Sequence, residues 1–414
     1  MVNLSKNWYN ANKRCKLRFV SLFYNLLFFL VERMSFMREY DKSHVEFLRL
    51  QQTPEMVHGA PIIIKRSPTE PRPGCADHHE NACMKMHWVA RQDDEGGAKK
   101  EDKPLTPQQA IQKMRDQMGF PNHNICSVEI HTKFETIKNG DNEVGLWRYY
   151  RRDTQYQKNR PCFIFYHGGG WVGGTPYTVE NPCRLIAELS GGVVFNVDYS
   201  LAPEKKYPNG VNDCWAALCH VYQHAEEYGI DPTKIAVGGD SAGGNMTAVV
   251  SLMDRDRGTH MVALQVPMYA AVTFKGSATP GYHFSIAEYE FDPSQEAELN
   301  PRVAISRPKD EEHDDEIMMG NLYFDDPEHQ CLETYASPLM EKDFTGMPRC
   351  LSVSCEYDGL RIQDELYAKR LAEDGVEVKS IRYRGVSHAF IDRLGFVPQA
   401  EDLCIEIAEA MKQM

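Results

Sequence analysis

The chain has 414 residues, of which 42% are hydrophobic and 25% charged, as is typical of a globular protein with a sizeable core. This length allows one large α/β domain with appendages or two modest domains. The formal net charge of −13 argues against a nucleic-acid binder, because neutralising phosphates needs clustered Lys and Arg. The twelve cysteines follow no disulfide-framework spacing, which favours free thiols in a reducing, cytoplasmic compartment.

Residues 1–37 combine a basic stretch with the apolar run Phe19–Val31. This order resembles the charged and apolar regions of a signal peptide, but no small-x-small cleavage motif follows. The run is also too short to span a bilayer comfortably. A leader, a membrane-surface anchor and an over-extended start stay open for this segment, and we do not expect membrane association.

Residues 38–125 form a polar N-terminal arm that we expect to be part of a cap. A helix is predicted to begin after Thr106, with Pro107 at its first position. Ile111, Met114 and Met118 would share one face of this helix.

The arm also holds a pattern compatible with tetrahedral zinc, C-x2-H-x4-C-x3-H, made by Cys75, His78, Cys83 and His87. It lies in a polar stretch flanked by Pro and Gly, without a supporting strand pattern. We therefore favour a solvated loop there and predict no metal.

Residues 126–414 alternate strand-like apolar runs with amphipathic helices, which predicts an α/β domain with a mostly parallel sheet and helices on both faces. Two alternating runs, Val128–Ile137 and Val144–Tyr150, are expected as antiparallel edge strands. The buried strands are predicted at Cys162–Tyr166, Val193–Val197, Ile235–Val237, Leu264–Val266 and Leu351–Val353, followed by an alternating run at Val376–Tyr383. Residues 273–333 break this rhythm and are expected to be an insertion that contributes to the cap.

The sequence Gly239-Asp240-Ser241-Ala242-Gly243 is a G-x-S-x-G motif between a strand and a helical run. That context is the one a nucleophile elbow requires, in which a tight turn exposes the serine hydroxyl at the sheet edge. The N-terminus of the following helix also directs N–H groups at a developing anion. Ser241 is therefore the candidate nucleophile.

A glycine run, Gly168-Gly169-Gly170, follows His167 at the end of a predicted strand. Glycine lets backbone N–H groups approach an oxyanion without a Cβ in the way. Two of these N–H groups together with that of Ala242 are predicted to form an oxyanion hole. The dinucleotide and P-loop signatures that would favour a phosphate site are absent from the sequence.

Asp358 and His388 complete the chain order nucleophile, acid, histidine. Each is expected just beyond a strand end, where His388 can exchange a proton with Ser241. Glu356 and Asp364 compete with Asp358 as the acid, and Asp358 is preferred. Trp171 and Tyr207 are candidates for the substrate pocket, with core packing as the alternative for both aromatics.

Together HGGG, GDSAGGN and YSLAPE resemble the hormone-sensitive-lipase family of α/β-hydrolases, which includes bacterial esterases and arylacetamide deacetylase-like enzymes. The resemblance covers roughly residues 126–414. It implies an eight-stranded hydrolase sheet, a cap built from the N-terminal arm, and ester hydrolysis without a cofactor.

The expected activity is serine carboxylesterase action on a small-molecule ester with a short acyl chain. Amide or lactone hydrolysis and lipid-ester hydrolysis remain alternatives, because the same residues serve any acyl transfer. A non-catalytic receptor is the remaining alternative, since the resemblance includes plant receptors that have lost the histidine, which this chain keeps. The oligomeric state stays open.

Overall fold

The computed structural model describes residues 38–95, 105–304, 317 and 319–414, without the side chains of 87–95. In this part of the chain a ten-stranded sheet has the order β1-β2-β10-β9-β8-β7-β5-β6-β4-β3. The strands are β1 Pro54–Val57, β2 Ala60–Lys65, β3 Ile130–Asn139, β4 Asn142–Arg151, β5 Arg160–Tyr166, β6 Val193–Asp198, β7 Ile230–Asp240, β8 Leu264–Met268, β9 Arg349–Tyr357 and β10 Val378–Ser387.

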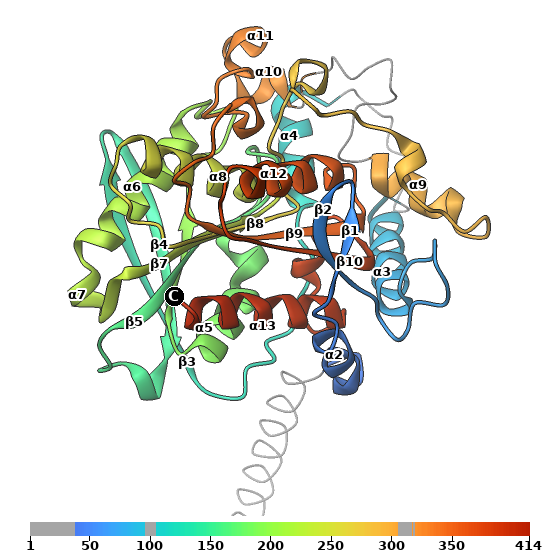
Figure 1. Ribbon diagram of the computed structural model, residues 1–414, viewed down its shortest axis with the longest axis horizontal. Helices are drawn as coiled ribbons and strands as arrows, with labels where there is room; N and C mark the ends of the chain where they lie inside the picture. The colour runs from blue at the N-terminus through green and yellow to red at the C-terminus, as the bar shows by residue number, and fades with distance from the viewer. Residues whose placement is uncertain (1–37, 96–104, 305–316, 318) are drawn as a thin grey trace, which may run out of the picture.

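The strands from β2 to β6 in this order are parallel, whereas β1, β4 and β3 at the two edges pair in antiparallel fashion. A parallel sheet needs crossover connections, and here helices fill that role. Figure 1 shows α6, α8 and α12 over one face and α5 and α13 over the other. These helices are α5 Glu180–Ser190, α6 Asn209–Gln223, α8 Ala242–Asp256, α12 Arg361–Glu373 and α13 Pro398–Lys412.

Both faces of the central strands are buried, which explains why their sequences are continuous apolar runs. In β5, Cys162, Ile164 and Tyr166 pack into the core on one side of the sheet. Phe163 and Phe165 pack into the core on the other side. The predicted class, a mostly parallel sheet with helices on both faces, is confirmed.

The N-terminal arm adds strands to the sheet, which has ten strands in the described part of the chain, whereas eight were expected. β2 pairs in parallel with β10, with Ile63 opposite Ile381, so part of the arm extends the sheet. Buried Lys65 forms ion pairs with Asp402 and Glu406 of α13, at 2.5 and 2.6 Å. Helix α2 (Lys42–Arg49) also lies against α13. The short apolar run Ile62–Ile64 supplies the strand that the sequence analysis missed.

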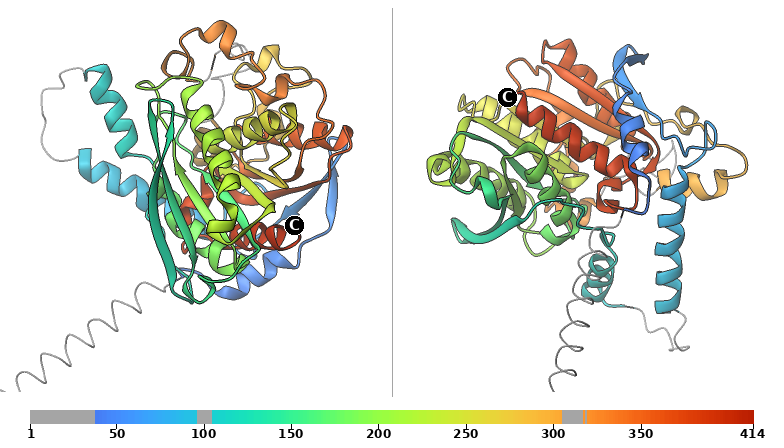
Figure 2. Two further views of the ribbon diagram at one scale, coloured as in Figure 1. Left: turned by 90° about the vertical axis from the view of Figure 1, so that its left-hand side faces the viewer. Right: turned by 90° about the horizontal axis from the view of Figure 1, so that it is seen from below.

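The remainder of the arm carries α3 (His78–Glu95) and α4 (Pro107–Asp116). Figure 2 shows these two helices close together, projecting from one side of the molecule. The predicted start of α4 is confirmed, because Thr106 caps it in a reciprocal capping box with Gln109.

The insertion contains short helices, among them α9 Glu296–Ala304, α10 Gly320–Tyr323 and α11 Pro327–Gln330. Its buried aromatic side chains, Tyr282, Phe284 and Tyr289, form a cluster with Ala76 of the arm and Tyr357 of β9. Backbone hydrogen bonding joins the same two segments, from Asp292 N–H to the Gly74 carbonyl at 2.8 Å. The arm and the insertion are therefore packed together beside the sheet.

The predicted apolar segment at residues 19–31 lies outside the described residues, as does the charged stretch 309–316 of the insertion. Across the described ranges, no helix combines the length and apolar character that a bilayer crossing requires.

Candidate active site

Ser241 lies in the tight turn between β7 and α8. Its backbone has a φ of 55° and a ψ of −116°, a conformation that side chains rarely adopt. The turn brings the flanking residues against β5: a Cβ on Gly239 or Gly243 would lie 2.3 or 1.8 Å from the carbonyl oxygen of Tyr166. Glycine is therefore required on both sides of the serine, which accounts for the G-x-S-x-G sequence.

The loop after β10 brings His388 to Ser241. Its Nε2 lies 2.8 Å from Ser241 Oγ, and its Nδ1 lies 2.6 Å from Asp358 Oδ2. Asp358 directly follows β9, is fully buried, and also accepts a hydrogen bond from the N–H of Leu360 at 2.9 Å. An ionised carboxylate can only accept, so Nδ1 carries the proton and Nε2 is free to accept from the serine hydroxyl.

Electrostatics favour the charged form of this pair. Burial alone would lower the pKa of His388, but the charge and hydrogen bond of Asp358, with a further contribution from Asp240, outweigh it, and the pKa is raised. For Asp358, burial would raise the pKa, but the charge of His388 and the hydrogen bonds outweigh it, and the pKa is lowered. Asp358 is thus held as a carboxylate that stabilises a protonated His388.

The competing acids have other partners. Glu356 accepts a hydrogen bond from the N–H of Gly385 at 2.8 Å and pairs with Arg384 at 3.3 Å. Asp364 accepts from the N–H of Ala270 at 3.3 Å, and burial raises its pKa well above the usual range. Among the three acids, the structure brings Asp358 to His388.

The glycine run lies beside the serine and lines the same cavity. The N–H of Gly168 donates to Asp240 Oδ1 at 2.8 Å, so it is not available to a ligand. Gly169 and Gly170 have φ values of 129° and 60°, and a Cβ on Gly169 would lie 2.1 Å from the carbonyl oxygen of Gly173. The N–H of Ala242, at the first position of α8, has no intrahelical partner. Among the described residues, the N–H groups of Gly169, Gly170 and Ala242 therefore remain available to a ligand.

Asp240 was not singled out from the sequence, although it stands inside the serine motif. Its hydrogen bond to Gly168 ties the nucleophile turn to the glycine run. Burial raises its pKa to about 6. Asp392 lines the cavity too, and burial followed by the charge of Asp240 raises its pKa well above the ordinary range.

The cavity that holds Ser241 and His388 has a volume of about 460 Å³. Its apolar wall comes from distant segments: Met114 and Met118 of the arm, Trp171 after the glycine run, Met319 of the insertion and Leu360 before α12. Met114 and Met118 were predicted to share a helix face, but α4 ends at Asp116, so Met118 lies just beyond the helix. Their place in the wall was not predicted, because it depends on how the arm packs.

The two pocket candidates differ in their outcome. Trp171 lines the cavity while its ring packs against Phe274 and Tyr323, so it is both a core and a pocket residue. Tyr207 is not among the residues that line this cavity, and its packing fits the alternative of a core residue. Its ring contacts Tyr323 and Phe324, and its hydroxyl donates to Glu333 at 2.8 Å.

The expected solvated loop around Cys75 and Cys83 is also corrected. Both thiols are buried, and residues 78–95 form α3. The side chain of His87 lies outside what the structure describes. Within the described side chains, no group of three or more His, Cys, Asp or Glu is arranged to hold a metal ion.

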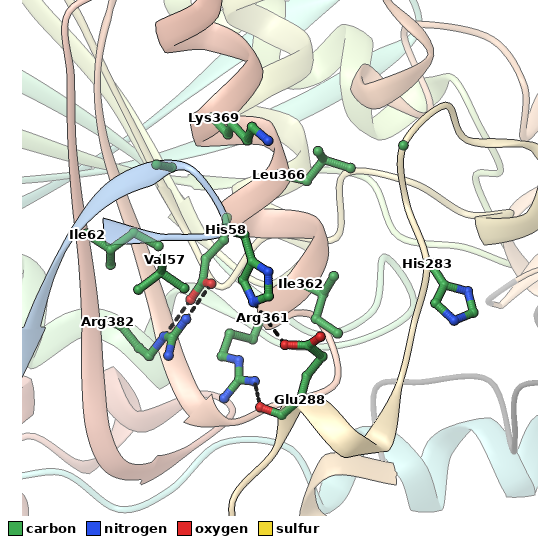
Figure 3. Close-up of a pocket in the computed structure, with 13 residues that line it drawn as sticks. Val57, His58, Ile62, His283, Glu288, Arg361, Ile362, Leu366, Lys369 and Arg382 are labelled. Carbon is green, nitrogen blue, oxygen red and sulfur yellow. Dashed lines mark hydrogen bonds and ion pairs between the residues drawn. The ribbon is translucent and has the colours of Figure 1, made fainter. Parts of the chain in front are cut away.

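A second cavity of about 250 Å³ lies between the β1–β2 hairpin, α12 and the insertion (Figure 3). Its charged side chains mostly pair with one another: His58 Nε2 lies 2.9 Å from Glu288 Oε2, and Arg382 lies 2.6 Å from Glu365. As the structure describes its lining, this cavity has no serine, threonine or cysteine. The candidate active site is therefore the cavity at Ser241.

Comparison with known proteins agrees with this geometry. A family model described as the alpha/beta hydrolase fold matches residues 163–392. An arylesterase from Saccharolobus solfataricus is 34% identical over 233 residues, which are 56% of this chain and 69% of that protein. Human arylacetamide deacetylase-like 3 is 30% identical over 259 residues, covering 53% of this chain and 63% of that protein. The chain belongs to the α/β-hydrolase fold family.

Solved structures point the same way. A hyperthermophilic esterase from the archaeon Pyrobaculum calidifontis is 31% identical, has a TM-score of 0.61, and matches over 80% of this chain and 97% of its own. A solved arylesterase reaches a TM-score of 0.63 at 28% identity, over 82% and 99% of the two chains. The resemblance inferred from the three motifs is confirmed.

Proposed function

We propose that this protein is a serine carboxylic-ester hydrolase that works through an acyl-enzyme intermediate at Ser241. The observation that carries the proposal is the hydrogen-bond chain from Ser241 Oγ through His388 to Asp358, next to free N–H donors. The esterase names of the relatives support the same reaction.

The reaction follows from these positions. Ser241 Oγ attacks the ester carbonyl carbon as its proton passes to His388 Nε2, and the N–H groups of Gly169, Gly170 and Ala242 donate to the oxyanion. Collapse breaks the bond to the alcohol oxygen, which takes the proton from His388. Water then attacks the acyl-enzyme by the same route, releasing the carboxylic acid and restoring Ser241.

We propose that the arm and the insertion act as the cap of this site. Met114 and Met118 from the arm and Met319 from the insertion line the cavity around the serine. Covering the site in this way excludes water and shapes the acyl pocket. Residues 126–414 would then be the catalytic domain, to which β1 and β2 of the arm add an edge.

The structure of the proposed cap favours small esters with short acyl chains as substrates over lipids at a membrane or emulsion surface. The insertion's aromatic side chains Tyr282, Phe284 and Tyr289 are buried and turned inward, so they offer no apolar docking face. The net charge of −13 would also oppose binding to anionic lipid.

Ester hydrolysis is favoured over amide hydrolysis with the same residues, because an alkoxide leaves more readily than an unprotonated amine. A receptor without catalysis is disfavoured by the aligned Ser241–His388–Asp358 hydrogen bonds. Labelling with a fluorophosphonate, followed by peptide mapping, distinguishes a catalytic role for this protein from a receptor role without catalysis. We expect a single adduct on Ser241, and absence of labelling together with absence of esterase activity would support the receptor.

We further propose a reducing compartment such as the cytoplasm. The cysteines in the described part of the chain are free thiols, and all but Cys219 are buried. Disulfides form and persist in oxidising compartments, where so many cysteines would be expected to pair. Counting thiols in the native protein before and after reduction checks this, because a gain on reduction would reveal disulfides.

A further inference from the structure

A buried carboxylate from the N-terminal arm contacts the loop that carries His388. Glu80 of α3 is fully buried, and its Oε1 accepts hydrogen bonds from the N–H and the hydroxyl of Ser387. The N–H contact measures 3.2 Å. Ser387 directly precedes His388, so a residue 307 positions earlier in the chain holds the backbone at the histidine.

Arg393 completes this contact from the other side of the loop. Its Nη1 donates to Glu80 Oε1 at 3.1 Å, and its Nη2 donates to the carbonyl oxygens of Ser387 at 3.0 Å and His388 at 2.7 Å. The guanidinium is buried as well. A buried charge needs its partner, so removing Glu80 would leave Arg393 uncompensated beside the histidine.

Glu80 also lies where the arm meets the insertion. Arg302 of α9 has Nη1 4.0 Å from Glu80 Oε1, and its Nη2 donates to Asn81 Oδ1 at 3.2 Å. Three segments far apart in sequence, α3, α9 and the loop after β10, thus converge on one carboxylate. This convergence links the proposed cap to the catalytic histidine.

We propose that Glu80 is a positioning residue for His388: through Ser387 and Arg393 it fixes the loop so that Nε2 stays at hydrogen-bond distance from Ser241 Oγ. The inference rests on the proposed role of His388 as general base. Asp358 orients the imidazole ring from Nδ1, and Glu80 holds the backbone from which the ring projects. A displacement of about 1 Å at a reacting group can cost about 100-fold in rate, so such support has a measurable effect.

Because Glu80 is charged, its removal should change the pKa of His388 and hence the pH dependence of the rate, which a change in packing alone would not do. The charged or titratable groups facing His388 are Asp358 and Asp240, which raise its pKa, Arg393, which lowers it, and Tyr269 and Asp392 nearby. Glu80 offsets the charge of Arg393. Without it, the pKa of His388 falls and the acidic limb of the rate profile moves to lower pH.

The test compares Glu80→Gln with Glu298→Gln in the full-length protein. Glu298 is the exposed carboxylate near Arg302, at 4.0 Å, and makes no contact with the histidine loop, so it is the matched control. Rates on a p-nitrophenyl ester are divided by the concentration of sites that a fluorophosphonate titrates, which removes the effect of unfolded protein. For Glu80→Gln we expect kcat to fall by about 10- to 100-fold with KM within about twofold, and the acidic limb to move to lower pH. Glu298→Gln should match the wild type.

An unchanged kcat and an unmoved pH limb in folded Glu80→Gln would overturn the proposal. If Glu80→Gln does not fold, the Ser387→Ala variant tests the proposal instead. It keeps the Glu80–Arg393 charge pair and removes one hydrogen bond to the loop. We expect a fall in kcat of about 3- to 10-fold for that variant, and wild-type kcat would overturn the proposal. Failure of the proposed function is distinguishable, since the wild type itself would then show no Ser241-dependent hydrolysis.

Discussion

The ionisation of His388 sets the pH range in which the protein should work. The general base must be neutral to accept the serine proton, and its pKa is raised mainly by Asp358 against the effect of burial. kcat/KM should therefore rise with pH through a midpoint above the ordinary histidine value of 6.5 and then level off. Rates on a p-nitrophenyl ester from about pH 5 to about pH 9 check this, and a flat profile would contradict it.

Two buried aspartates near the site make a matched pair for substitution. Asp358→Asn removes the charge that orients and stabilises His388, and kcat should fall by about 10⁴-fold. Asp364→Asn changes a buried carboxyl group that accepts from the Ala270 N–H, not from His388, and whose pKa burial raises. We expect its kcat to stay within about threefold of the wild type. Equal losses in the two variants would show that Asp358 has no special role.

The sequence predicts Ser241, Asp358 and His388 because each stands just beyond a strand end in a fixed chain order. It does not predict Asp240's bond to Gly168, nor the exclusion of Tyr207 from the cavity. Both depend on side-chain directions between segments that are far apart in the chain.

Among the elements, strand β2, which lies next to the edge strand β1, is joined to α13 by a buried ion cluster. Lys65 contacts Asp402 and Glu406, and the three side chains are almost wholly buried. Lys65→Met would leave buried Asp402 without its cation, whereas Glu406 keeps Lys379 at 2.7 Å. The free energy of unfolding should therefore fall by about 3–5 kcal/mol. Urea denaturation followed by circular dichroism measures this loss.

The control for the Lys65→Met variant is an exposed ion pair at the same hairpin, in which Arg66 Nη1 lies 2.9 Å from Glu55 Oε1. Glu55→Gln should cost at most about 1 kcal/mol, because water screens exposed ion pairs. A loss below about 1 kcal/mol for Lys65→Met as well would mean that β2 is not anchored as described.

The strands from β3 onward and the start of α4 are predicted well because their sequence patterns are strong, whereas the short helices α9 to α11 of the insertion are not predicted. The β1–β2 hairpin and α3 are not predicted from the sequence, because their local patterns are weak. β2 has one short apolar run and pairs with a strand more than 300 residues away, and α3 is rich in polar side chains. Their structure depends on packing against the finished domain rather than on local pattern.

At the scale of the whole molecule, the proposed cap would limit the size of the substrate. A cavity of about 460 Å³, lined by Met114, Met118 and Met319, leaves room for a modest acyl group. Each buried CH₂ contributes up to about 0.8 kcal/mol while there is room, so kcat/KM should rise and then fall beyond about 2 to 6 carbons. A p-nitrophenyl ester series measures this limit, and Met319→Ala should move it to longer chains.

The chain-length prediction also separates the esterase from a lipase. A kcat/KM still climbing at about ten carbons, or a jump in rate when triolein forms an emulsion, would contradict the proposed cap and favour a lipid substrate.

The most direct test of the whole account is the dependence of ester hydrolysis on one hydroxyl group. Ser251 of the same helix, α8, is buried and bonded to the Thr247 carbonyl, so Ser251→Ala is the matched control for Ser241→Ala. Both variants should fold, as judged by circular dichroism. Ser241→Ala should lose about 10⁴- to 10⁶-fold in kcat and all fluorophosphonate labelling, while Ser251→Ala keeps both. Retention of more than about a tenth of the wild-type kcat by folded Ser241→Ala would contradict the account.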